Sequence, residues 1–197
     1  MPELSGRKAL SHQRIVDVAS RAIRRQGYDG VNVTEVMHAA QLTHGGFYAH
    51  FASRDALLAE AVAKAGADIA QAVRDQSARL VAAGASPFRA MVEIYLSIEH
   101  VHDCENGCPV SLLAGEMFRQ VPEGAEPSRR LIGNLHAQVT RALPAGAPAD
   151  AAWTVASTVL GAVQLARALV DSDPRTAAAV LADTKKNLLE RYDTLRR

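Results

Sequence analysis

Three helix-start signals, at positions 32, 43 and 53, constrain the fold of this 197-residue chain more than any other feature. Asn32 is followed three positions later by Glu35, which is the residue pair of a capping box. Thr43 and Ser53 are also of the residue types that most often precede a helix. Because each cap begins a new helix, the segments between the caps have room for only about two turns each. The sequence therefore predicts two short helices in close succession and then a third helix.

The segments on either side read as longer amphipathic helices. Ser11–Arg25 carries its apolar residues at the i, i+3, i+4, i+7 spacing, and Gly27 suits the left-handed position beyond a helix end. Leu57 begins a second stripe that continues to about Leu80. Hydrophobic residues make up 48% of the chain but aromatic residues only 5%, whereas strands collect aromatic and β-branched residues. We therefore expect an all-α protein that begins with a helix-turn-helix unit.

Residues 42–51, LTHGGFYAHF, form an unusual helix start because glycine costs about 1 kcal/mol relative to alanine in a helix. Leu42 and Phe47 fit a hydrophobic staple around the Thr43 cap, and Phe47 and Phe51 share one helix face. Adjacent glycines at the start of a recognition helix would allow its backbone to approach DNA closely. The alternative is a glycine hinge between helices, with the aromatic residues serving only the core.

The segment Arg14–Val62 resembles the DNA-binding region of the TetR family of transcriptional regulators, and the likeness is carried by residues 27–62, GYDGVNVTEVMHAAQLTHGGFYAHFASRDALLAEAV. The resemblance implies an all-helical homodimer, usually a repressor, that binds double-stranded operator DNA. It also implies a small-molecule effector that releases the DNA. Residues 1–52 would form the DNA-binding domain, and residues 53–197 would form the ligand-binding and dimerisation domain.

Residue by residue, the resemblance places nine positions near the DNA backbone or bases. Two residues depart from the family pattern. Gln41 occupies the turn position usually held by glycine, so it must adopt a left-handed conformation or reshape the turn. His44 stands where Lys or Arg is common, and histidine is largely uncharged near neutral pH. The expected DNA-contacting residues are Asn32, Thr34, Thr43, His44, Gly45, Gly46, Tyr48, His50 and Arg54.

Charge and targeting signals agree with a regulator of the cytoplasm. Residues 1–54 hold seven Lys and Arg against four Asp and Glu, a net charge of +3, while the remainder has a net charge of −2. A basic head suits an anionic partner. The start of the chain lacks the apolar core of a secretory signal, and the apolar run Ala151–Ala166 is short for a membrane span. We expect a cytoplasmic protein without a cofactor.

Two C-terminal segments suit a dimer interface of the kind found in this family. Trp153–Val170 is apolar around most of its circumference, so a helix there needs neighbours on several sides. Arg175–Leu195 follows a cap at Asp173 and carries a leucine-rich seam. A purely intramolecular bundle is the alternative. A pocket for the effector is less defined, and its candidate residues are Met91, Tyr95, Ile98, Leu112, Glu116, Met117, Trp153, Leu160 and Gln164.

The stretch HVHDCENGC, residues 100–108, has several interpretations. Cys108 precedes Pro109, so it would cap a helix whose dipole stabilises a thiolate. Some regulators of this family sense oxidants or electrophiles through cysteine, and Cys108, with Cys104 as partner, would do so here. His100, His102 and both cysteines could instead bind zinc, although four ligands within nine residues are unlike usual structural sites. Cys108 could also be an enzyme nucleophile with a histidine base, or a loop residue without a special role.

The sequence as a whole favours a ligand-responsive repressor that binds a palindromic operator as a dimer. A small-molecule or thiol-reactive signal would release it from DNA. The alternative from a different class is a thiol- or metal-dependent helical enzyme.

Overall fold

The computed structural model describes residues 2–117, 119 and 122–193, and these residues form helices and connecting turns without a strand. The prediction of an all-α fold is confirmed. In chain order the elements are α1 (Pro2–Gly30), α2 (Val33–Ala39), the 3₁₀ helix η1 (His44–Ala49), α3 (Arg54–Ala82), α4 (Pro87–Tyr95), α5 (Ile98–His102), α6 (Pro109–Met117), α7 (Pro122–Ala142), α8 (Ala151–Leu169) and α9 (Pro174–Tyr192).

Side-chain caps determine where several helices begin. The Asn32 side chain accepts from the backbone N–H groups of the first turn of α2, as predicted. Ser53 Oγ accepts from Ala56 N at 3.0 Å at the start of α3. Asp173 Oδ1 accepts from Thr176 N at 3.1 Å, and Pro174 then opens α9. These caps satisfy N–H groups that have no partner within their own helix.

The first helix is longer than its predicted span. Residues 11–25 are helical as expected, but α1 extends from Pro2 to Gly30. The helix is interrupted at Gly27, where φ is 75° and ψ is 179°. The left-handed φ predicted for Gly27 is therefore present. The chain nevertheless resumes a helical turn beyond it, up to Gly30.

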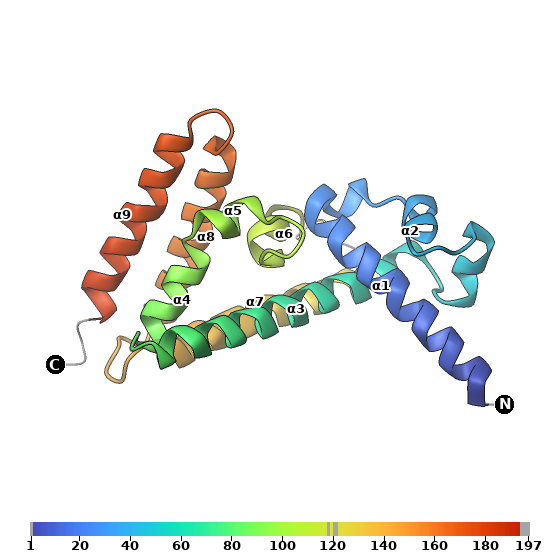
Figure 1. The fold of residues 1–197 in the computed structure, drawn as a ribbon, viewed down its shortest axis with the longest axis horizontal. Coiled ribbons are helices and arrows are strands. Elements are labelled where there is room, and N and C mark those ends of the chain that lie inside the picture. The colour runs from blue at the N-terminus through green and yellow to red at the C-terminus, as the bar shows by residue number, and fades with distance from the viewer. Residues whose placement is uncertain (1, 118, 120–121, 194–197) are drawn as a thin grey trace.

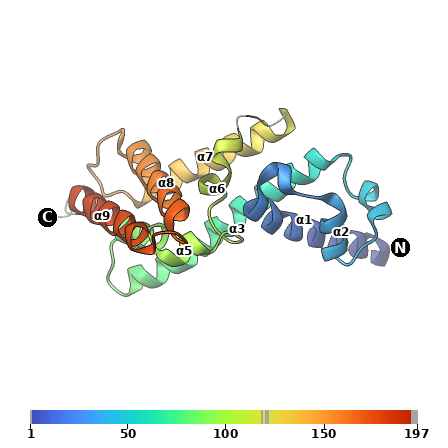
Figure 2. The same cartoon turned by 90° about the horizontal axis from the view of Figure 1, so that it is seen from above.

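The helices form a head and a body joined by one long helix (Figure 1). The head contains α1, α2 and η1, packed on the start of α3. From there α3 runs into the body, where α7 lies along it and α4 packs near its end. The last two helices, α8 and α9, pack as a pair on the far side of the body, away from the head (Figure 2). The short helix α6 lies between head and body and contacts α1, α3, α7 and α8.

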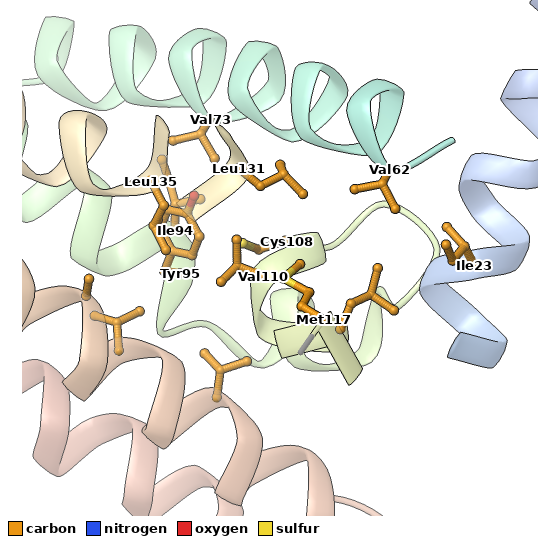
Figure 3. Close-up of a cluster of buried hydrophobic side chains, with 14 of the residues drawn as sticks. Ile23, Val62, Val73, Ile94, Tyr95, Cys108, Val110, Met117, Leu131 and Leu135 are labelled. Atoms are coloured by element: carbon orange, nitrogen blue, oxygen red, sulfur yellow. The ribbon is translucent and has the colours of Figure 1, made fainter. Parts of the chain in front are cut away.

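One hydrophobic core runs through the head and the body. It begins with residues such as Ile15 and Ile23 in α1 and continues through Val62 in α3 to Tyr192 in α9. Figure 3 shows its middle section, where Met117 of α6 lies near Ile23 and Val62. In the described part of the chain, none of the helices has the length and apolar character needed to cross a bilayer.

Replacing Ser53 with alanine tests the cap that starts α3. The Ser53→Ala variant should lose about 1 kcal/mol of unfolding free energy, because the N–H of Ala56 loses its acceptor. Its melting temperature should fall by about 2–4 °C. Ser77→Ala, inside the same helix, is the matched control and should leave the melting temperature unchanged or slightly raised. Equal effects of the two substitutions would show that the Ser53 cap is not what stabilises the start of α3.

Candidate nucleic-acid interface

The helix-turn-helix unit is held together by short local interactions. Asn32 Oδ1 accepts from Thr34 N at 2.8 Å and from Glu35 N at 3.4 Å, which fixes the start of α2. The side chain of Thr34 then contacts the second short helix, since its Oγ1 lies 3.2 Å from His44 Nδ1. The carboxamide oxygen of Asn32 is thus committed to capping, while both Asn32 and Thr34 remain exposed to solvent.

The turn between α2 and η1 requires a left-handed residue, and Gln41 supplies it with a φ of 60°. The turn is closed by hydrogen bonds from Gln41 N to His38 O and from Leu42 N to Met37 O, both at 2.9 Å. Of the two alternatives for Gln41, the structure shows the left-handed conformation. This costs about 1–2 kcal/mol relative to a right-handed residue.

The second short helix differs from its prediction. Thr43 is extended and precedes the helix as expected, but its side chain makes no capping hydrogen bond. Residues 44–49 form a 3₁₀ helix instead of an α-helix, with a bond from Gly46 N to Thr43 O at 3.0 Å. Two successive glycines disfavour α-helix formation, and about two turns of the tighter helix connect Leu42 with Phe51.

The aromatic residues of this segment divide between the core and solvent. Phe47 and Phe51 are 2% and 3% exposed, and their rings stack with centroids 5.6 Å apart. Tyr48, between them, is 75% exposed. The prediction that the two phenylalanines anchor the segment is confirmed. Tyr48 presents its hydroxyl on the outer surface of η1.

The glycine pair is not required by contacts within the protein. A Cβ atom added to Gly45 would have no neighbour within 4 Å. At Gly46 it would meet only Met37 Cε and Thr43 Oγ1, each at 3.8 Å, which is ordinary van der Waals contact. Neither glycine has a positive φ. Contacts within the described chain therefore do not require glycine at either position.

Two of the residues expected at DNA face the protein instead. His50 is half-buried; burial, together with the positive charges of His12 and Lys8, lowers its pKa. The Arg54 guanidinium donates to the backbone carbonyls of Tyr28, Asp29 and Val31, so it holds the end of α1 against the start of α3. Their DNA contacts stay predictions, and the structure gives Arg54 a structural role that the sequence did not indicate.

The head is tied to the body at the Gly27 kink. Glu116 Oε2, on α6, accepts from Tyr28 N at 2.8 Å. A Cβ at Gly27 would lie 2.5 Å from Glu116 Oε1, so glycine is required both by its φ and by this close approach. Arg25 also pairs with Glu105 at 2.7 Å, although both side chains are well exposed. Glu116 was predicted as a pocket residue, but the structure shows it binding the backbone of α1.

The remaining pocket candidates are dispersed. Met91, Tyr95 and Leu160 surround a void of only about 10 Å³, too small for a ligand. Ile98, Trp153 and Gln164 lie on the surface, Leu112 is half-buried and Met117 is packed in the core. Tyr95 alone among the nine candidates lines the larger cavity of about 570 Å³ between α3 and α7.

The structure contradicts the prediction that the start of α6 stabilises a thiolate at Cys108. Cys108 precedes α6, as predicted, but only 2% of it is exposed. Burial raises the pKa of the Cys108 thiol, and this outweighs the N–H groups of Ser111 and Val110 and the charge of Arg167, which lower it. The thiol is thus stabilised in its neutral form. Cys104 is only partly buried and is the more accessible of the two.

The surroundings of His100 do not suit a general base. Burial, with a smaller effect from Arg167, lowers the pKa of His100 to about 4. Its Nε2 is buried and has no hydrogen-bond partner among the described residues. Such a neutral, enclosed imidazole is a poor general base. The described residues also contain no group of three or more His, Cys, Asp or Glu side chains arranged to hold a metal ion.

The interactions of this region centre on Arg167, whose importance the sequence analysis missed. From α8, its guanidinium donates to the carbonyls of His100 at 3.1 Å and Val101 at 3.2 Å. It also donates to Ser111 Oγ at 3.0 Å, at the start of α6. A single arginine interrupting an apolar helix was the available signal, because a cation in that position needs polar partners.

Comparison with known proteins agrees with this arrangement of a helix-turn-helix head on a helical body. Residues 15–61 match the family model of the bacterial regulatory proteins of the tetR family. No curated protein matches the chain in sequence. The match covers the helix-turn-helix head, so residues 15–61 carry the DNA-binding region of this family, as the sequence resemblance predicted.

Solved structures share the fold over nearly the whole chain. Escherichia coli NemR in its reduced form is 15% identical, with a TM-score of 0.74 over 95% of this chain and 99% of its own. A TetR-family regulator from Agrobacterium tumefaciens is 20% identical, with a TM-score of 0.72 over 94% and 98% of the two chains. One from Chloroflexus aurantiacus is 20% identical, with a TM-score of 0.70 over 93% and 94%. At these identities the likeness establishes the fold alone.

Thiol labelling tests whether Cys104 reacts faster than Cys108, as their burial predicts. In the native protein, iodoacetamide should modify Cys104 at least about tenfold faster than Cys108, because Cys108 must first become exposed by local opening. Mass spectrometry of peptides sampled over time gives both rates. Cys104→Ser, as control, should leave a protein that is labelled only slowly until it is unfolded. Equal rates for the two cysteines, or faster labelling of Cys108, would contradict the burial argument.

Proposed function

We propose that this chain is a ligand-responsive transcriptional repressor of the bacterial cytoplasm. It binds a palindromic operator as a homodimer and is released by a small-molecule or thiol-reactive signal. Residues 1–52 provide DNA binding, and residues 53–197 provide ligand binding and dimerisation. The observation that carries the proposal is the glycine pair at 45 and 46, exposed at Gly45 and half-buried at Gly46, which lies beside the exposed Tyr48 and is not required by contacts within the chain.

Glycines on an outer surface allow another backbone to approach without interference from a side chain. Around them, Thr43, His44 and Tyr48 are exposed and carry hydrogen-bond donors. Donors of this kind contact phosphate oxygens and fix the register of a protein on the duplex. The net charge of +3 over residues 1–54 supplies the sequence-independent attraction to DNA. We therefore place η1 in the major groove.

The dimer is proposed to form through the outer face of α8 together with α9. That face of α8 is uncharged and includes Trp153, 51% exposed, and Leu165, 59% exposed. Between them lies the exposed Gly161, where an added Cβ would meet no atom within 4 Å. An uncharged face with large apolar residues and a central glycine suits close packing against its own copy around a twofold axis. Leu195, part of the predicted seam, lies outside the described residues.

Release from DNA is proposed to pass through α6. One end of this helix follows Cys108 beside the body core, and Glu116 near its other end binds the backbone of α1. A ligand that displaces α6 would therefore change the position of the head. A thiol-reactive signal would act at Cys104, which precedes α6 in the chain and is the accessible thiol.

DNA binding is tested with two substitutions on the surface of η1. Tyr48→Phe should weaken binding to all DNA sequences alike by about two- to tenfold, because a phosphate contact carries no base information. Gly45→Leu should abolish specific binding while leaving the melting temperature within about 2 °C, since the added side chain points into open space. Fluorescence anisotropy with DNA flanking the gene gives both affinities. Unchanged affinity of Gly45→Leu would remove η1 from the interface.

The same titration separates the repressor from the enzyme alternative. A regulator forms a sequence-specific complex whose affinity falls steeply with salt concentration. A helical enzyme without a DNA substrate would show no such complex with any selected sequence.

The dimer interface is tested by placing a charge on the exposed face of α8. Leu165→Glu should convert the dimer to a monomer at micromolar concentration, because a carboxylate would be buried without a partner at the interface. Light scattering coupled to size exclusion measures the mass. Thr140→Glu on α7, exposed and outside the proposed interface, is the control and should remain dimeric. A wild-type protein that is monomeric and still binds the operator tightly would contradict the proposed symmetry.

A further inference from the structure

The cavity between α3 and α7 opens to solvent on one side and is bordered by apolar side chains on the other. Its volume of about 570 Å³ lies within the range of ligand pockets. Small residues on α3 leave this space open, among them Ala63, Ala67 and Ala70. At Gly66 the two helices touch, since a Cβ there would fall 2.2 Å from Leu131 Cδ2. The cavity is therefore formed by helices that are in contact at one point and separated by short side chains beyond it.

The inner wall of the cavity is apolar. Leu131 and Leu135 of α7 and Val110 of α6 contribute to it, and all three are buried. Figure 3 shows Leu131, Leu135, Tyr95, Cys108 and Val110 around the space enclosed by α3, α6 and α7. The Tyr95 hydroxyl donates to Gln138 Oε1 at 3.4 Å, which adds one polar group to the wall. A ligand must therefore present an apolar body to this surface.

The outer part of the cavity is cationic. Three arginines line it, Arg74 on α3 and Arg130 and Arg141 on α7, together with the amide side chain of Asn134. Arg74 donates to Gln71 at 2.6 Å, and Arg130 lies 3.8 Å from Glu126 in an exposed, weakly paired arrangement. No Asp or Glu is among the described residues that line the cavity. An anionic group entering here would meet three guanidinium groups and no carboxylate in the wall.

A neighbouring cavity has the opposite charge. A second space of about 520 Å³, also bordered by α3, is lined by Glu93, Glu99 and Asp103 against a single Lys185. An anion would be repelled there. The two cavities thus have similar volumes, but the charged residues that line the first are cationic and most of those that line the second are anionic.

We propose that the cavity between α3 and α7 binds an amphipathic small-molecule anion, with its acid group at the arginines and its apolar body against Leu131 and Leu135. The inference rests on the proposed function in one respect: the bound anion is the effector that acts on DNA binding. Cys108 and Val110, at the start of α6, also form part of the cavity wall. Occupancy is thereby transmitted to the helix whose Glu116 holds α1.

The proposal is tested by calorimetric titration of the full chain with three probes that share a ten-carbon body. Decanoate carries an anionic head, decan-1-ol a neutral head and decylammonium a cationic head. Decanoate should bind at one site per chain, at least about tenfold more tightly than either of the others. Its affinity should fall as salt is added, because the arginines are partly exposed. Equal binding of decanoate and decan-1-ol would overturn the assignment to an anion.

Substitutions of residues that line the cavity test whether decanoate binds there. Arg130→Gln and Arg141→Gln should each weaken decanoate binding by roughly three- to tenfold, since solvent screens part of each contact. Arg129→Gln is the matched control, because Arg129 adjoins Arg130 on α7 and pairs with Glu126 at 2.6 Å but does not line the cavity. Ala70→Phe should fill the cavity and abolish binding, with the melting temperature confirming that it folds. Equal losses for Arg129→Gln and Arg130→Gln, or undiminished binding by folded Ala70→Phe, would exclude this cavity.

Anion binding at the cavity and DNA binding by the head can be tested independently of each other. Decanoate binding is measured without DNA, so the cavity can be confirmed in a protein that recognises no operator. Conversely, a sequence-specific complex with DNA that decanoate leaves unchanged, although decanoate binds at the cavity, would overturn the effector role while leaving the repressor intact.

Discussion

A carboxylate of α6 ties the body to the head at the kink of α1. Glu116 of α6 accepts the N–H of Tyr28 at 2.8 Å, beside the kink that Gly27 makes in α1. The kink exposes this N–H, because Gly27 leaves the helical conformation. The carboxylate can approach it only because Gly27 has no Cβ. This bond adds a directed polar contact to the packing of α6 against α1.

The body gives α6 a defined position at its other end. Arg167 reaches from α8 to the carbonyls of His100 and Val101 and to Ser111 in the first turns of α6. Burial lowers the pKa of the Arg167 guanidinium, whose N–H groups are satisfied by these oxygen acceptors. The same enclosure keeps the His100 imidazole and the Cys108 thiol neutral. We interpret this polar region as structural support for α6.

Local features of the sequence predicted the head well. Caps such as Asn32 and Ser53 and the pairing of Phe47 with Phe51 depend on residues within a few positions of one another, so pattern alone identifies them. The 3₁₀ geometry of η1 was missed because two glycines weaken the α-helix without specifying a replacement. Cys108 was misjudged because its capping position is local, whereas its burial depends on α3, α7 and α8. The cavity arginines were missed for the same reason, since Arg74 and Arg141 meet only when α3 packs on α7.

Amide hydrogen exchange at Tyr28 tests most directly whether Glu116 of α6 binds the backbone of α1. In the wild-type protein the Tyr28 N–H should exchange slowly, because it is bound to Glu116 and lies beside a buried side chain. In Glu116→Ala it should exchange at least about tenfold faster, while the amides of Ile15 and Ile23 in the same helix keep their wild-type rates. This result would show that the carboxylate holds the head at the kink. Identical Tyr28 exchange in the two proteins would contradict the account.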